Sequence, residues 1–569
     1  MERYTSCTVE LELFDTGAID GVTLSATNKM SFSSVESIKE ENENLVQFAT
    51  LEPDYFLLDG SLQTYDTIDN LKSKVGYMSR YFTSSITGTF SSYHSSVGIT
   101  FHFYETVPDE MKIQFFDGDS LIEEGTFYPD DLKYFAELLA SNYNKVVMTF
   151  TNTDRYTRIN YIDFGTKIEY GSDLDKKLKS ASLTEEVDTF SSTLPIDESS
   201  LEVIDELGMF DITNPKSYYQ YLQKRQRFKI YETINDTKEL VAVHYLKEWS
   251  QTKELLASFE LQDIIGLMNE TTFYGGMYTN VKAGDLIEEI MSDYGFEDYT
   301  IDDELKDIEL SGYLKKQSHR EALQQVAFAI GACVSTARNA GVRIFKPLYE
   351  NLGIIDSDRK LISTAHEIKQ KDLVTGVSLT AHSYSLDGET SQITKATFNP
   401  GTYRVLFNDP CENLTITGGT LLGSNCNYAD IQVDAAGEVI INGTKYVDNS
   451  VVYSYKNEIY ASSIDENILE VTDATLVSAS NVTDLLESIY TIKQYRLEHS
   501  LNIIEIGEVP AGTYAVKSNG AYAPLLITKL TSDLAGGYTA QVEGVGYALR
   551  INEYYKAGSE LYAGSEGII

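Results

Sequence analysis

Apolar and polar residues alternate with a period of two in run after run of this 569-residue chain. Such runs begin at residues 98, 111, 145 and 158 and read GITFHF, MKIQFF, KVVMTF and RINYIDF. Because successive side chains of a strand point to opposite faces, each run is expected to bury one face of a sheet. The 40 tyrosines and 24 phenylalanines, against 10 prolines, suit half-buried sheet surfaces. The pattern predicts a mainly β, multi-domain protein built from β-sandwich or β-barrel units.

Glycine-containing dipeptides between the predicted strands indicate tight hairpin turns. Five of them stand out: Asp117-Gly118, Gly418-Gly419, Asn442-Gly443, Asn519-Gly520 and Gly536-Gly537. The stretch 49–62, ATLEPDYFLLDGSL, is expected to be an extended connector between two units.

Residues 271–347 are predicted to form a small α+β module set into the β protein. Two apolar stripes at helical spacing mark its helices: Ala283, Leu286, Ile287, Ile290 and Met291, then Leu323, Val326, Ala327 and Ile330. Gly295 should end the first helix, and Ser318 with Glu321 should form a capping box at the start of the second. His319 is expected to lie in that first turn without a catalytic role. A further helix is predicted near 481–498, with Val482, Leu485, Leu486, Ile489 and Ile492 on one face.

The charge of the chain argues against nucleic acid as a specific partner. With 45 basic and 86 acidic side chains the formal charge is −41, whereas phosphate binding needs clustered cations. The dense group Lys224, Arg225, Arg227 and Lys229 is expected to be a solvated face. No run of 18 apolar residues and no leader pattern appears, so we expect synthesis in the cytoplasm and no membrane span.

Sequence motifs for catalysis are missing from the chain. There is no GxSxG, HExxH or phosphate-binding loop, and the many carboxylates prevent any acid/base pair from being chosen by spacing. Cys7, Cys333, Cys411 and Cys426 form no CxxC pair; a disulfide between the last two, and a metal pair of His94 and His102, are minor alternatives. We therefore expect no catalytic residues, no cofactor, no metal and no enzymatic activity.

Several phrases of the sequence resemble phage tail proteins. FYGGMYTNVKAGDLIEEIMSDYGF (273–296) and SGYLKKQSHREALQQVAFAIGACVSTARNAGVRIFKP (311–347) resemble a module of tail-tip, tail-associated proteins from phages of Gram-positive bacteria. LKSASLTEEVDTFSSTLPI (178–196), YLQKRQRFKIYE (221–232) and ASFELQDIIGLM (257–268) resemble the first β-domain of baseplate hubs. GEVPAGTYAVKSNGAYAPLLITKLTSDLAGGYTAQVEGVGY (507–547) resembles their closing β-domain, and SSVGITFHF with NTDRYTRINYIDFG resembles an inserted jelly-roll, carbohydrate-binding-like module.

The resemblance divides the chain into five expected units. These are an N-terminal β segment and connector (1–79), a jelly-roll-like domain (80–165), a first hub β-domain (166–270), the α+β module (271–347), and a second hub β-domain region with one helix (348–569).

The function that the resemblance implies is structural. A homotrimeric baseplate hub or tail-tip protein would close the tail tube, contact distal tail and baseplate proteins, let DNA pass without binding it, and reside in a virion or tail-like particle assembled in the host cytoplasm. The alternatives are a distal tail protein, a receptor-binding protein for host glycan and, least favoured, a cell-wall glycan hydrolase. Glycan contact would fall to surface aromatics of the jelly-roll-like unit, with Tyr93, Tyr104 and Tyr128 as candidates.

Overall fold

The protein is mainly β, with its strands distributed over several sheets. The computed structural model describes residues 5–29, 35–41, 76–79, 81–153, 157–172, 177–214, 217–235, 237–253, 255–361, 366–457, 466–518 and 521–547. The connector expected at 49–62 and the Asn519-Gly520 turn lie outside these residues. Among the described segments, no helix has the length and apolar character needed to span a bilayer.

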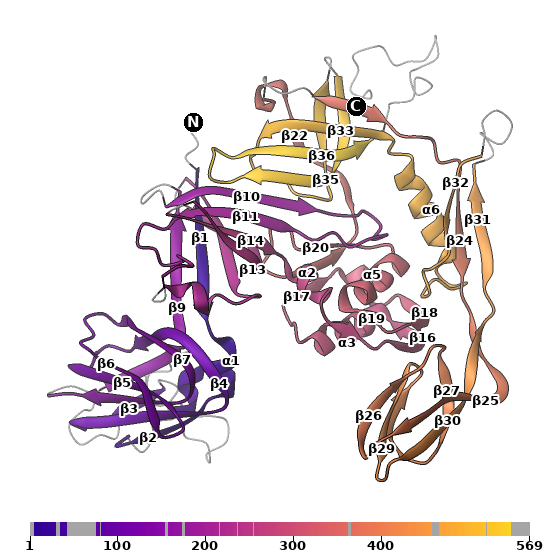
Figure 1. Ribbon diagram of the computed structural model, residues 1–569. Helices are drawn as coiled ribbons and strands as arrows, with labels where there is room; N and C mark the ends of the chain where they lie inside the picture. Colours follow the sequence, from indigo (N-terminus) through magenta and orange to yellow (C-terminus); the bar gives the residue numbers. More distant parts are fainter. Residues whose placement is uncertain are drawn as a thin grey trace, which may run out of the picture.

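A 13-stranded sheet forms the centre of the molecule (Figure 1). Seven of its strands come from the N-terminal half of the chain: β9 (Gly165–Gly171), β1 (Thr5–Phe14), β12 (Arg227–Ile234), β13 (Thr237–Lys253), β14 (Leu256–Gln262), β11 (Glu198–Ile204) and β10 (Leu178–Glu186). The other six follow the α+β module: β35 (Ala521–Asp533), β36 (Thr539–Gly546), β33 (Leu497–Ile504), β23 (Glu367–Gln370), β34 (Gly512–Ser518) and β22 (Leu348–Ile355).

The two halves of the central sheet meet where β10 pairs antiparallel with β35, from Ser182↔Asp533 to Glu186↔Lys529. Tyr538 closes the same joint, because its hydroxyl donates to the carbonyl of Ser6 at 2.7 Å. Backbone pairing therefore makes one continuous sheet from segments far apart in sequence.

The central sheet crosses two of the boundaries drawn from the sequence. β1, from the segment 1–79, pairs with both β12 and β9, and β9 itself begins at Gly165. The five-part division of the chain remains a proposal. In the central sheet, strands from different units of this division pair with one another and contribute to the same hydrophobic core.

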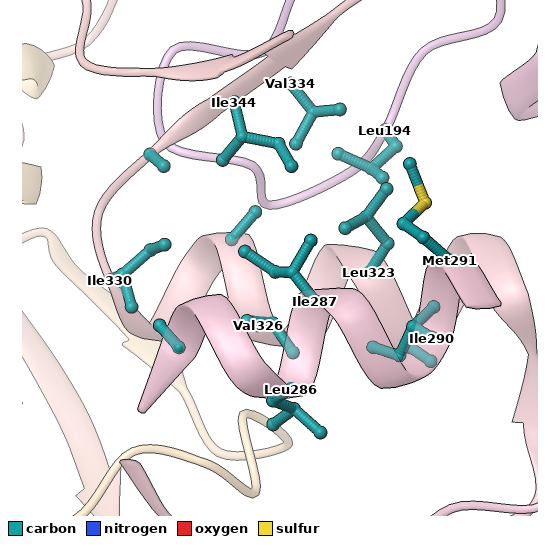
Figure 2. Packing of buried hydrophobic residues seen from close by; sticks show 14 of the residues in the cluster. Leu194, Leu286, Ile287, Ile290, Met291, Leu323, Val326, Ile330, Val334 and Ile344 are labelled. Atoms are coloured by element: carbon teal, nitrogen blue, oxygen red, sulfur yellow. The ribbon is translucent and has the colours of Figure 1, made fainter. Parts of the chain in front are cut away.

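The helices of the α+β module pack face to face, as Figure 2 shows. α3 (Ala283–Tyr294) ends at Gly295 in a left-handed conformation with φ 84°, and α5 (His319–Ala329) begins with the predicted Ser318–Glu321 capping box. The predicted apolar stripes are buried against one another and against Leu194, Val334 and Ile344. Both helix predictions are confirmed. His319 is also buried, and its ring bridges Thr271 and Asp293 at 2.9 and 3.0 Å.

Short strands complete the module around the two helices: β15 (Thr272–Phe273), β16 (Gly276–Lys282), β17 (Tyr299–Ile301), β18 (Glu309–Leu314), β19 (Gln317–Ser318), β20 (Cys333–Ser335) and β21 (Val342–Phe345). Two short helices, α2 (Ile264–Met268) and α4 (Asp303–Lys306), lie beside them. The core of the module includes residues of α2, so the module packs directly on the end of the central sheet.

The N-terminal lobe, at the lower left of Figure 1, is a seven-stranded sheet in the order β3-β8-β4-β7-β5-β6, with β2 paired to β4. Its strands are β2 (Thr23–Thr27), β3 (Tyr77–Ser79), β4 (Thr83–Phe103), β5 (Glu110–Asp117), β6 (Ser120–Phe127), β7 (Lys133–Thr151) and β8 (Thr157–Asp163). The first part of β4 pairs with β2 and the end of β7, and its last part with β8 and the start of β7. Three register shifts between residues 89 and 98 separate these parts, and bulges of this kind bend a strand.

A second small β unit, which the sequence reasoning missed, lies at the lower right of Figure 1. Two three-stranded sheets, β25-β30-β27 and β26-β29-β28, enclose a core of their own. The strands are β25 (Tyr384–Phe398), β26 (Gly401–Leu406), β27 (Cys411–Thr417), β28 (Thr420–Asn425), β29 (Tyr428–Val433) and β30 (Gly437–Asp448). This insert lies between β24 (Gly376–Ala381) and β31 (Val451–Lys456) in the chain. β24 pairs with β31 on one side and with β32 (Ile468–Val471) on the other.

The helix predicted near 481–498 is α6 (Val482–Lys493), and all five apolar residues of its expected face are buried. It packs with β24 and ends earlier than expected because the chain enters β33 at Leu497.

Of the turn predictions, Gly418-Gly419 and Gly536-Gly537 fall between consecutive strands, as expected. Asp117-Gly118 also marks a hairpin, with Asp117 as the last residue of β5 and Gly118 in the turn to β6. The prediction of a turn at Asn442-Gly443 is wrong. Both residues lie inside β30, where Asn442 pairs with Gln392 on one side and with Thr415 on the other. A side chain at Gly443 would approach Leu414 to 2.8 Å, so the glycine permits close strand packing instead of a turn.

Candidate functional site

Buried ionisable groups gather at the turn that follows β20, residues 336–338, where the α+β module meets both halves of the central sheet. Arg338 adopts φ 52°, an uncommon value for a side-chain-bearing residue. Its guanidinium lies 3.1 Å from Glu185 of β10 and 3.4 Å from Glu232 of β12, and it also bonds Glu505 beyond β33. One cation therefore holds three segments together.

The Arg338 cluster is withdrawn from solvent. The side chains of Glu185 and Glu505 are each 1% exposed, that of Glu232 is 7% exposed, and that of Arg338 is 15% exposed. Burial raises the pKa of Glu185 although Arg338 opposes the shift. Burial also works to lower the pKa of Arg338, but the three carboxylates outweigh it and the pKa lies above its ordinary value. Removing either kind of partner would leave buried charge uncompensated.

A second buried group in the same turn joins two carboxyls through one hydroxyl. Thr336 Oγ1 lies 2.8 Å from Asp197 Oδ2 and 2.9 Å from Asp263 Oδ2. A hydroxyl carries one hydrogen and can donate it to only one of these oxygens. The second short contact can be a full hydrogen bond only while one of the two carboxyls keeps its proton. Burial accordingly raises the pKa of Asp263 to about 6 and raises that of Asp197 well above its ordinary range.

We predict that Asp197→Asn stabilises the protein at alkaline pH. The carboxyl pKa is higher in the folded than in the unfolded state, so the stability it contributes is complete below the unfolded value near pH 4 and is lost as pH rises through the folded value. An asparagine amide can donate to Thr336 without ionising. The melting temperature of the variant should exceed that of wild type at pH 8, corresponding to about 1 kcal/mol, and match it at pH 4.

The exposed Asp387→Asn is the matched control and should show no pH-dependent difference from wild type. Equal pH dependence of the Asp197 variant and wild type would contradict a protonated pair.

The three tyrosines proposed for glycan contact do not lie together in one site. Tyr93 lies in the bent part of β4, is 60% exposed and donates to Asp117 at 3.1 Å, next to the β5–β6 turn. Tyr128 is 66% exposed and follows the opposite end of β6. Tyr104, partly buried, follows β4 where its backbone amide donates to Arg158. Glycan contact by these residues remains a proposal.

The cysteines and histidines form no metal site in the described part of the chain. Within those ranges, no three His, Cys, Asp or Glu side chains come together as a group that could hold an ion. His94 and His102 bond different carboxylates, Asp15 and Asp163. All four cysteines are buried free thiols, although the Cys411 amide donates to the Cys426 carbonyl at 3.0 Å.

Comparison with known proteins gives a result at the level of structures only. No family model and no curated relative matches the sequence. A tail protein from Neisseria meningitidis MC58 aligns with a TM-score of 0.38 and 8% identity, over 65% of this chain and 92% of that one. The prophage tail protein gp18 from Listeria monocytogenes EGD-e aligns with a TM-score of 0.37 and 10% identity, over 67% and 91%. The E. coli c3393 protein, a type VI secretion component, aligns with a TM-score of 0.30 and 8% identity, over 65% and 74%. Similarity this low carries no weight for function.

Proposed function

We propose that this chain is a structural hub or tip protein of a phage tail or tail-like particle, acting as a homotrimer that closes the tail tube. The observation that carries the proposal is the β10–β35 joint, which unites two β-rich halves on either side of the α+β module in one sheet. The sequence phrases that resemble the first and closing domains of hubs fall on these two halves. Three copies of two such halves would offer six docking surfaces to a hexameric tube.

In the same proposal, the buried Arg338 cluster would hold the parts of the hub in a fixed arrangement. A cation shared by β10, β12 and the segment after β33 ties both halves of the sheet to the α+β module. The charge of −41 suits a conduit through which DNA passes without adhering. In this proposal the partners are tube, distal tail and baseplate proteins, and the protein resides in the particle.

We expect the purified protein to be a trimer, or to become one when tube subunits are added. Light scattering coupled to gel filtration should give three times the chain mass, and images of the complex with tube subunits should show threefold symmetry. A monomer at high concentration that also fails to join tube subunits would contradict the hub proposal.

A second role, binding of host glycan by the N-terminal lobe, is supported by the exposure of Tyr93 and Tyr128. Aromatic faces in solvent can stack on sugar rings, but the two rings lie at opposite ends of β6. Either ring would therefore act in a site of its own.

A further inference from the structure

A serine, a histidine and an aspartate form a hydrogen-bonded chain on the N-terminal lobe. Ser92 Oγ lies 3.0 Å from His94 Nε2, and His94 Nδ1 lies 2.9 Å from Asp15 Oδ2. Ser92 and His94 belong to the bent part of β4, whereas Asp15 directly precedes α1 (Thr16–Gly21). The order hydroxyl, imidazole, carboxylate, with both distances below 3.2 Å, is the arrangement that activates a serine nucleophile.

The carboxylate of this chain is fixed in position. Asp15 caps α1, with its Oδ1 accepting from the amide of Ala18 at 3.0 Å, and its own amide donates to the carbonyl of Phe164 at 2.9 Å. Its second oxygen is thereby directed at His94. Since an ionised carboxylate can only accept, the hydrogen of the neutral imidazole lies on Nδ1. The lone pair of Nε2 then faces the hydroxyl of Ser92, as a general base requires.

Neighbouring aromatic rings hold the imidazole of His94 in place, whereas the side chain of Ser92 is exposed to solvent. The ring of His94 packs 4.9 Å from that of Phe90 and 6.3 Å from that of Tyr143, and its side chain is 9% exposed. Ser92 is exposed. Register shifts on both sides of His94 interrupt the pairing of β4 with β7 there, and such bulges redirect side chains. A buried base next to an accessible hydroxyl is the combination that a covalent mechanism needs.

We propose that Ser92 is the nucleophile of an ester-hydrolysing site, with His94 as general base and Asp15 as a positioning residue. Ser92 Oγ attacks the carbonyl carbon of the ester while its proton passes to His94 Nε2. The tetrahedral intermediate expels the alcohol, which takes that proton, and leaves an acyl group on Ser92. Water, deprotonated by His94, then attacks the acyl-serine. The second tetrahedral intermediate releases the carboxylic acid as His94 returns that proton to Ser92 Oγ. The net reaction is ester plus water giving alcohol plus acid.

The surroundings of Ser92 indicate the class of ester. The hydroxyl stands on an open surface beside the exposed ring of Tyr93. An open serine can reach an acyl group that projects from a polymer, and the adjacent aromatic face can stack on a sugar. The substrate class is therefore a short acyl ester, such as acetyl, carried by a polysaccharide. This activity is independent of the proposed hub role.

The first experiment treats the full-length protein with a fluorophosphonate and locates the adduct by peptide mass spectrometry, alongside 4-nitrophenyl acetate hydrolysis. The label should fall on Ser92, and Ser92→Ala should abolish it and lower the hydrolysis rate at least about 100-fold. Ser91→Ala, next to it and also exposed, is the matched control and should keep both. Absence of label on Ser92 in wild type, or an unchanged rate in Ser92→Ala, would overturn the proposal.

Asp15→Asn tests the positioning role, because an amide at Oδ2 favours the wrong imidazole tautomer. The kcat for 4-nitrophenyl acetate should fall about 100-fold or more with little change in KM, and the pH profile should change shape. A merely structural Asp15 would lower the melting temperature and leave the pH profile of the folded fraction as in wild type.

Acetylated xylan tests the polymer assignment. Wild type should release acetate from it, and Ser92→Ala should not. Hydrolysis of 4-nitrophenyl acetate without acetate release from the polymer would overturn the polysaccharide assignment. Ser92→Ala should assemble like wild type in the trimer measurement, so failure of this proposal and failure of the hub proposal give different results.

Discussion

Replacing Arg338 with alanine should destabilise the central sheet by about 3 to 5 kcal/mol, the usual cost of removing one partner from a buried ion pair. Glu185, Glu232 and Glu505 would remain near one another with no guanidinium between them. Urea unfolding followed by the fluorescence of Trp249, the single tryptophan, reports on this region because Trp249 lies on β13.

The size of this effect should depend on pH. Burial already raises the pKa of Glu185 against the opposing effect of Arg338, so removing Arg338 should raise it further. The variant should therefore be least stable at pH 8, where Glu185 must ionise, and should recover part of the lost stability as the pH falls to 5. Arg338→Lys keeps the positive charge but loses the planar guanidinium, so its free energy of unfolding should lie between those of wild type and Arg338→Ala. Arg225→Ala is the control, because its pair with Glu270 is about half exposed and such pairs contribute about 0 to 1 kcal/mol. Equal losses in the two alanine variants would contradict the account of the cluster.

Val326→Asp should cost a comparable amount, about 3 to 5 kcal/mol, by placing a carboxylate where no partner can reach it. Val326 has no exposed surface and faces the stripe of α3 (Figure 2). Scanning calorimetry should show a lower melting temperature for the transition that contains the α+β module.

The control for the added charge is Ser292→Asp on the exposed face of α3, which should cost less than about 1 kcal/mol. An unchanged transition in the Val326 variant would show that the stripe is not buried in solution.

Local features of the structure could be predicted because their causes lie within a few residues. The capping box of Ser318 and Glu321 needs only a spacing of three, and the stripes of α3 and α6 need only the helical period. The alternation of β5 or β8 likewise requires no knowledge of which strand lies beside it.

Pairing between distant segments could not be predicted in this way. The sequence of β10 does not indicate that β35 is its neighbour in the sheet. The strands of the insert, residues 384–448, have no sequence pattern that separates them from the strands of the central sheet. The same limit kept the buried charge cluster and the Ser92–His94–Asp15 chain from being predicted. Asp15 is 79 residues from His94, and the turn carrying Thr336 and Arg338 is over 130 residues from Asp197 and Glu185. Within their own short segments, these residues are distinguished only by being polar, which does not predict that they meet.

The joint between β10 and β35 also sets an order of events during synthesis. β10 leaves the ribosome long before residues 521–533 exist, so one edge of the first half-sheet stays open while the rest of the chain is made. Unpaired edges attract other strands, and contacts this distant form slowly. A chain cut short before β35 would keep that edge exposed and would lack the bond from Tyr538 to Ser6. Only a chain translated through residue 538 can therefore cover this edge of the sheet and make the bond from Tyr538 to Ser6.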